Sequence, residues 1–219
     1  KQECVAKSAF WVTKKRYGQW IINDGGLECD KLDVKGLDIV RSNFPPAMKD
    51  LMTQVLKDIL GNVDKDSIDE KILKFKKAMK TTDIMNIALS TSVKKINKFQ
   101  DKKNKSNGIF TSMLKGTPVH VKAAWIYNDL MNYWDLNNFE KIKSSEKIKW
   151  VYLKSNTMNI KQIAFKGYDD PPKIMEFIEQ NIDYDKLFIR ALEKKIRMFY
   201  EALNWDMPVD KINTLERFF

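Results

Sequence analysis

Short apolar runs in the first 42 residues predict β-strands. Residues 8–13 (SAFWVT) and 18–22 (GQWII) are rich in aromatic and β-branched side chains, which favour strands. The turn signal NDGG at residues 23–26 precedes a third extended segment at 32–42. That segment contains Gly36, and a glycine inside a strand marks a bulge or the close approach of another molecule. We expect Trp11 to be buried, and all six tryptophans to belong to the core rather than to base-stacking platforms.

From Asn43 onward the spacing of apolar residues becomes helical. A first helix is predicted from a cap at Asn43, with Pro45 or Pro46 in its first turn, as far as Gly61. A second helix follows a capping-box pattern formed by Ser67 and Glu70. We expect these two helices to form a hairpin.

The remainder of the chain mixes helices and strands. Residues 90–118 look irregular, and a third helix is predicted at 119–134. Two paired strands, a short helix and the longest helix are predicted to follow, at residues 146–155 with 159–165, 173–180 and 184–203. The predicted fold class is α+β: a mainly helical domain with a small antiparallel sheet, preceded by a few strands.

The positive charge is concentrated in two stretches. The net charge is +10. Residues 90–122 hold eight Lys and one Asp, a net +7, and residues 141–161 hold six Lys and one Glu, a net +5. The other residues together sum to −2, so the basic excess indicates a surface for an anionic partner, either nucleic acid or an acidic membrane.

A catalytic centre is not recognisable in this sequence. One histidine, His120, and two cysteines at unsuitable spacing argue against a zinc site or a hydrolase triad. The pairs Asp64/Asp66 and Asp183/Asp185 could bind Mg²⁺, but each precedes a predicted helix, where capping explains an Asp. We therefore assign no catalytic residue and no metal ligand. Unpaired cysteines and the lack of a long apolar run favour a cytoplasmic protein without a membrane span.

Four motifs occur in an order that resembles family B DNA polymerases. Lys14-Lys15-Arg16-Tyr17 is similar to the family's KKRY motif, and Lys35-Gly36 with Arg41 to the next element before the thumb. Residues 87–99 resemble a thumb stretch that follows the DNA backbone. A later thumb pattern matches at Pro118, His120, Lys122, Ala123, Ala124, Tyr127 and Asn128.

The order of the motifs and the C-terminal layout resemble the T-even-phage type of replicative polymerase. The resemblance implies palm strands at 1–42 and a thumb domain at 43–211. The palm aspartates that hold Mg²⁺ would lie before Lys1, so the chain alone is expected to bind no cofactor and to be inactive. Its implied partners are primer–template duplex DNA and the remainder of the polymerase, in the same chain or as a separate subunit. The residues predicted to bind DNA are Lys14, Lys15, Arg16, Tyr17, Lys35, Gly36, Arg41, Ser90, Thr91, Ser92, Lys94, Lys95, His120, Lys122, Tyr127 and Asn128.

The C-terminal segment 212–219 ends on bulky apolar residues. Leu215, Phe218 and Phe219 resemble sliding-clamp-binding peptides, and T-even-type polymerases end in such a tail. Ile212 stands where such peptides often have Gln. The resemblance therefore implies a sliding clamp as a further partner and, for a phage protein, the cytoplasm of a bacterial host. The alternative is that these side chains pack on their own domain.

Two other functions remain open from the sequence. The chain is compatible with a non-catalytic basic nucleic-acid-binding module unrelated to polymerases, for which the order of motifs would be accidental. A membrane-surface protein is the less favoured alternative, because the basic stretches are predicted as loop and strand rather than as an amphipathic helix.

Overall fold

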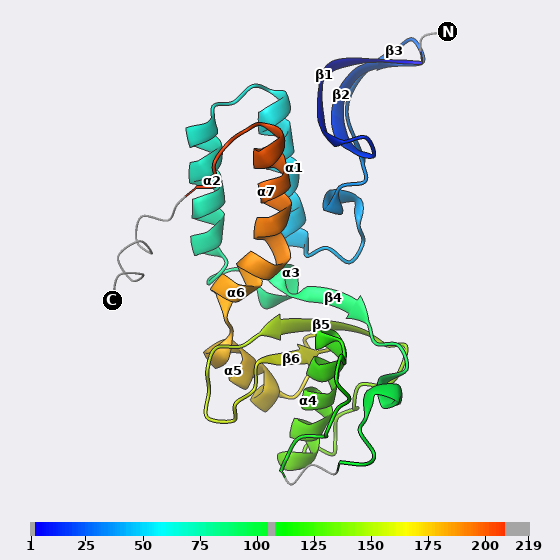
Figure 1. Ribbon diagram of the computed structural model, residues 1–219, viewed down its shortest axis with the longest axis vertical. Helices are drawn as coiled ribbons and strands as arrows, with labels where there is room; N and C mark the ends of the chain where they lie inside the picture. Colours follow the sequence, from blue (N-terminus) through cyan, green and yellow to red (C-terminus); the bar gives the residue numbers. More distant parts are fainter. Residues whose placement is uncertain (1–2, 105–107, 209–219) are drawn as a thin grey trace. The chain divides into compact units, whose positions relative to one another are not determined.

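The computed structural model describes residues 3–104 and 108–208 and divides the chain into two compact units (Figure 1). Unit 1 combines the N-terminal part up to Ile87 with the C-terminal part from Phe188, and unit 2 comprises Ala88–Leu187. Both contain helices and an antiparallel three-stranded sheet, which confirms the α+β prediction. The predicted boundary between palm and thumb at residues 42/43 does not coincide with the division into these two units, and it stays a prediction.

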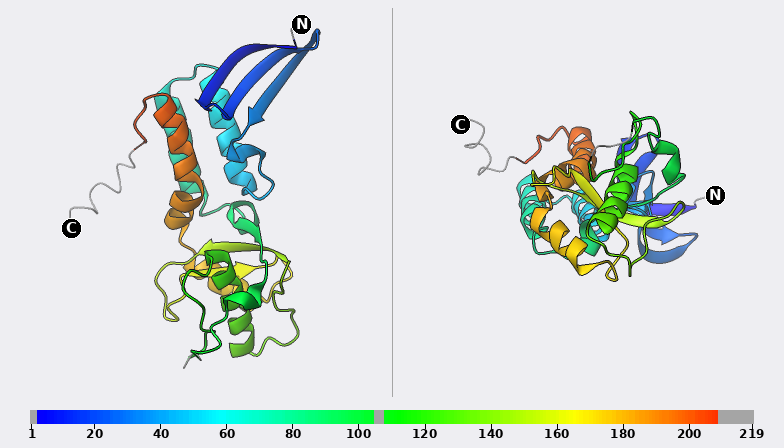
Figure 2. Two further views of the ribbon diagram at one scale, coloured as in Figure 1. Left: turned by 45° about the vertical axis from the view of Figure 1, so that its right-hand side comes forward. Right: turned by 90° about the horizontal axis from the view of Figure 1, so that it is seen from below.

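The first sheet of unit 1 consists of β1 (Cys4–Thr13), β2 (Arg16–Asp24) and β3 (Leu27–Lys35) in the order β1-β2-β3 (Figure 2). The glycines of the β2–β3 turn have positive φ, as the turn signal predicts. The third strand begins and ends earlier than predicted. Residues 36–42 do not continue the strand, because Gly36 has φ +69° and a 3-10 turn, η1 (Asp38–Val40), follows it.

One face of this sheet packs on the helices of unit 1. The ring of Phe10 meets that of Phe199 edge-on at 5.5 Å, and Gly18 lies directly against the Leu56 side chain. Alternation along the strand then turns Trp11 to the other face, where it is 55% exposed. The prediction of a buried Trp11 is therefore wrong, and the other five tryptophans are only partly buried.

Helices α1 (Pro46–Leu60) and α2 (Lys65–Ala78) lie side by side in unit 1, as the predicted hairpin requires (Figures 1 and 2). An ion pair between Lys71 and Asp58 joins them. Gly61 ends α1 as predicted, but Pro45 rather than Asn43 is its N-cap residue.

The start of α2 also differs from the prediction. Asp64 is the N-cap residue and accepts hydrogen bonds from the amide and the hydroxyl of Ser67, at 2.9 and 2.8 Å. The prediction that the capping box begins at Ser67 is therefore wrong, because the helix begins about one turn earlier, after Asp64. The same contacts confirm that Asp64 caps a helix.

The predicted helix 184–203 is a helical run with an interruption. It comprises α6 (Tyr184–Phe188), a π-helical turn (Ile189–Glu193) and α7 (Lys194–Ala202). A separate short helix, α3 (Ile84–Ile87), follows α2 earlier in the chain. Asp183 accepts a hydrogen bond from the Lys186 amide at 2.9 Å and so caps the start of α6. The predicted apolar face is buried from Phe188 to Phe199.

Unit 2 is built on the sheet order β4-β5-β6, with β4 (Leu89–Ser92), β5 (Lys147–Tyr152) and β6 (Gln162–Phe165). Helix α4 (Val119–Tyr133) packs on β6 and β5, and α5 (Pro172–Asn181) completes the unit. The expectation of an irregular segment at 90–118 is wrong at its start, which contains β4 and the 3-10 turn η2 (Ile96–Phe99). The helices of the described residues are too short or too polar to cross a membrane.

Candidate nucleic-acid interface

The cationic motif of unit 1 forms the tight turn between two strands. Lys14 and Lys15 are the exposed residues of the β1–β2 turn, and Arg16 and Tyr17 open β2. A two-residue turn holds the lysines on a rigid sheet, so little freedom is lost when they meet a ligand. The sequence placed these cations at a strand end, and the structure agrees.

Gly36 lies directly against this turn. A Cβ atom at position 36 would lie 2.0 Å from the backbone oxygen of Lys15, and the φ of +69° at Gly36 is unfavourable for other residues. The close approach inferred from sequence is therefore real, but the approaching group is this chain's own backbone rather than another molecule. Gly36, which the sequence predicts to contact DNA, thus also determines where the Lys15 carbonyl can lie.

Two of the predicted cations have contacts within unit 1. Arg16 donates from Nη1 to Sδ of Met198 on α7 at 3.2 Å. Arg41 pairs with Asp38 of η1, with Nε and Oδ1 3.3 Å apart. Both guanidinium groups are on exposed residues, so these contacts orient them and leave donors facing solvent.

Tyr17 and Lys35 are directly opposite one another on β2 and β3. The Lys35 ammonium lies over the Tyr17 ring, 5.9 Å from its centroid. The nearby Tyr17 side chain and, after it, the Asp33 carboxylate raise the pKa of Lys35 above its ordinary value. The structure thus brings together two residues that the sequence assigned to separate motifs.

In unit 2 the two basic stretches of the sequence become neighbours. β4 pairs with β5 so that Ser90 lies opposite Lys149 and Ser92 opposite Lys147. The stretches 90–98 and 141–149, about 50 residues apart in sequence, therefore share one sheet. Sequence reasoning paired β5 only with β6 and missed the exposed Lys147, although alternation within β5 gave a signal for an outward-facing lysine.

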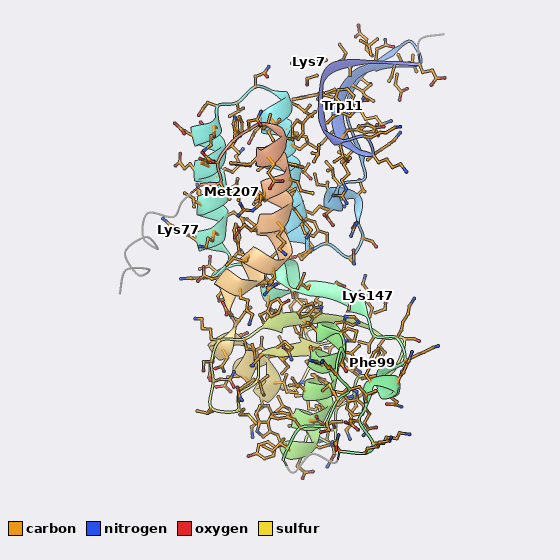
Figure 3. All side chains as sticks on the ribbon, in the orientation of Figure 1. Lys7, Trp11, Lys77, Phe99, Lys147 and Met207 are labelled. Atoms are coloured by element: carbon orange, nitrogen blue, oxygen red, sulfur yellow. The ribbon has the colours of Figure 1, made fainter. Side chains whose placement is uncertain are left out.

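We call the exposed residues at this junction the basic edge. Figure 3 shows Lys147 and Phe99 on the same flank of unit 2. The members of the basic edge are Ser92, Lys94, Lys95, Lys98 and Lys147.

Two side chains hold the turn that carries the lysines of the basic edge. Trp125 on α4 donates from Nε1 to the Ile96 carbonyl at 3.2 Å, and the Ser144 hydroxyl accepts from the Ile96 amide at 3.0 Å. Both backbone groups of Ile96 are thereby fixed by residues from other segments. Lys95 has the left-handed φ of +51°, a strained conformation that such support maintains.

His120 and Lys122 lie in the first turn of α4, and both are partly buried. Burial lowers the pKa of His120 below its ordinary value of 6.5, since the charged imidazole loses hydration. His120 is therefore mainly neutral near pH 7 in the free chain. A phosphate nearby would favour the protonated form and reverse this shift.

Tyr127 and Asn128, which the resemblance assigns to DNA binding, are interior in the structure. Tyr127 is 1% and Asn128 7% exposed. The Tyr127 hydroxyl donates to Asp170 at 2.6 Å, and burial, with that carboxylate, raises the pKa of Tyr127 strongly. Asn128 exchanges two hydrogen bonds with the backbone of Ile142, at 2.9 and 2.7 Å. Asn128 thus holds the segment before β5 against α4, and Tyr127 does the same for the segment after β6.

The described residues do not fit a metal centre. In residues 3–104 and 108–208, no three His, Cys, Asp or Glu side chains are grouped as metal ligands. The first residue of each Asp pair, Asp64 and Asp183, caps a helix, as its contacts show. The predicted clamp-binding residues Leu215, Phe218 and Phe219 lie outside the described residues.

Exposed lysines on turns and strands, beside hydroxyl groups, are chemically suited to contacts with the phosphate backbone of nucleic acids. Comparison with protein families is more specific: the sequence model of DNA polymerase family B matches residues 1–202, so the chain belongs to that family. A comparison with curated proteins gives no match. Family membership makes DNA the partner and DNA-directed DNA synthesis the activity of the polymerase. It also excludes a module unrelated to polymerases.

Proposed function

We propose that this chain forms the end of the palm and the thumb of a T-even-phage-type replicative DNA polymerase. In this role it holds the primer–template duplex without reading its sequence. The observation that carries the proposal is the junction of two basic stretches at β4 and β5 in a member of family B.

The basic edge supplies contacts that are equivalent at every step of synthesis. Lys94, Lys95 and Lys147 present ammonium groups, and Ser92 adds a hydroxyl that can bond a phosphate oxygen. Phosphates are identical for all base pairs, so the duplex can advance by one step without losing the chemistry of the contact. Attraction of this kind depends on salt, because binding releases counterions.

The KKRY turn has a different proposed role. Lys14, Lys15 and Tyr17 lie on a rigid sheet and would face the minor groove near the primer end. Minor-groove acceptors are nearly the same for all base pairs, so these residues can check pair geometry without sequence preference. Tyr127 and Asn128 support the thumb from inside and are not part of the proposed contact surface.

Other parts of the polymerase complete the reaction in this proposal. The Mg²⁺ ions of phosphoryl transfer are held by palm aspartates of the complete polymerase, and this chain alone is inactive. The segment 212–219 tethers the polymerase to a sliding clamp, which lengthens residence on DNA by raising the effective concentration. For a phage protein, the compartment is the bacterial host cytoplasm.

Salt-dependent binding of the 219-residue chain to a fluorescently labelled primer–template duplex tests the proposal. About six phosphate contacts predict a slope of about −5 for log affinity against log salt concentration. Replacing Lys94 and Lys95 together by Gln should make the slope less negative by about 2, because each lost contact contributes about 0.9.

A matched control replaces Lys74 and Lys77 on α2 by Gln. These two exposed lysines line a hollow with Asp66, Asp69 and Glu70, so their local field does not favour a phosphate. The control variant should keep the slope of the wild-type chain. Duplex affinity that does not change with salt contradicts the proposal.

A further inference from the structure

Trp11 is the exposed end of an aromatic row on the outer face of the first sheet. Pairing places Trp11 opposite Tyr17, and Tyr17 opposite Lys35, across all three strands. The two rings are 6.1 Å apart between centroids and tilted by 36°. We call Trp11, Tyr17 and Lys35 the outer ladder; Figure 3 shows Trp11 on β1.

Exposure of one tryptophan is not by itself evidence of a contact, because single exposed apolar residues are common. The surroundings of Trp11 are more informative. Its neighbour Phe10 is buried on Phe199, so the strand has an inner face and Trp11 is held on the other one. The ladder is continuous with the Lys14–Lys15 turn, and Lys35 provides a cation at its far end.

We propose that Trp11 is a DNA-contacting residue that packs on deoxyribose rings of one strand of the product duplex, while Lys35 pairs with a phosphate of the same strand. This inference rests on the proposed duplex-holding function and adds a residue that the KKRY resemblance does not include.

The dimensions of the ladder determine how the duplex would lie. Three strands at about 4.8 Å spacing give a ladder about 10 Å long, which equals the rise of about three nucleotide steps of 3.4 Å along the helix axis. The ladder exceeds the minor-groove width of about 6 Å, so Trp11 and Lys35 at its ends would reach the sugar–phosphate backbone that borders the groove, with Tyr17 facing the groove between them. Bases in a duplex are already stacked, so the sugar is the apolar surface available to Trp11.

The test measures affinity of the 219-residue chain for labelled duplex and single-stranded DNA over a range of salt concentrations. Trp11→Ala should weaken duplex binding about five- to tenfold, the effect of removing about 50 Å² of buried apolar surface. The salt slope should not change, since no charge is lost. Lys35→Gln should instead make the slope of log affinity against log salt concentration less negative by about 0.9.

Two variants serve as controls. Trp11→Phe keeps an aromatic contact and should bind duplex within about twofold of the wild-type chain, by the same area argument. Leu27→Ala removes another apolar residue, 76% exposed, from the opposite end of the same sheet, and should leave duplex affinity unchanged. The difference in tryptophan emission between the wild-type chain and Trp11→Phe should change when duplex is added.

The outcomes separate this inference from the function on which it rests. If the wild-type chain binds duplex but Trp11→Ala binds equally well and the emission difference is constant, Trp11 does not contact the duplex and the inference fails alone. If Trp11→Ala weakens only single-strand binding, Trp11 stacks on free bases, and the inference is also overturned. If the wild-type chain does not bind duplex, both proposals fail.

Discussion

Replacing Gly36 by Ala should destabilise unit 1 and displace the KKRY turn. Two costs add at this position. An L residue at the left-handed φ of +69° loses about 1–2 kcal/mol. The new Cβ would also lie 2.0 Å from the Lys15 oxygen, whereas ordinary contacts begin at 3.4 Å, so the carbonyl must withdraw by roughly 1.4 Å.

Overpacking of this severity costs about 1–3 kcal/mol, because neighbouring backbone must shift. The total expected loss for Gly36→Ala is therefore about 2–5 kcal/mol in the free energy of unfolding. Gly25→Ala is the matched control. Its φ of +63° is nearly the same, but nothing lies within 4 Å of its Cβ, so only the cost of about 1–2 kcal/mol applies.

Urea denaturation followed by far-ultraviolet circular dichroism measures both losses, and duplex affinity reports the displaced turn. Gly36→Ala should be less stable than Gly25→Ala by about 1–3 kcal/mol and should bind duplex more weakly. Equal stabilities for the two variants would refute the close packing of Gly36 on Lys15. Lower stability with unchanged duplex affinity would remove the turn from the contact surface.

Four further changes have defined outcomes. Trp125→Phe keeps the ring but removes the hydrogen bond to Ile96 and should cost about 0.5–1.5 kcal/mol of stability in thermal denaturation; duplex affinity should also fall, because the turn that carries the lysines of the basic edge loses a support. Tyr127→Phe removes the buried bond to Asp170 and should cost about 1–2 kcal/mol of stability in urea without changing duplex affinity; a large loss of affinity would restore Tyr127 as a contact. The pKa of His120 is lowered in the folded chain, so stability from the neutral imidazole is complete above about pH 6.5 and is lost as pH falls toward the folded pKa. A proton NMR titration of this single histidine should give a pKa below 6.5 that rises when duplex is added. Deleting residues 215–219 from the complete polymerase should abolish clamp-dependent processivity and spare short synthesis; processive synthesis that survives the deletion would assign the tail a structural role.

The sequence by itself determined most helices and strands of this protein. The turn signal at 23–26, the glycine after α1 and the apolar period of α4 depend on neighbours within a few residues, so local pattern is sufficient to predict them. The order of the motifs also determined the family, since each motif is a run of residues near one another in sequence, and the family match confirms it.

Only the tertiary structure decided which of these residues meet. The pairing of β4 with β5 joins segments about 50 residues apart, and no local period encodes that choice. Tyr127 and Asn128 follow helical spacing, yet Asp170 and Ile142, from distant segments, make them interior.

The same reason explains Trp11 and Gly36. An apolar run predicts a strand but not which face the helices cover, so Trp11 was expected inside and lies outside. A glycine predicts a close approach but not by what, and the Lys15 carbonyl is the answer. Local sequence sets the conformation of each segment, whereas the contact surface depends on long-range pairing and packing that become defined only when the chain folds.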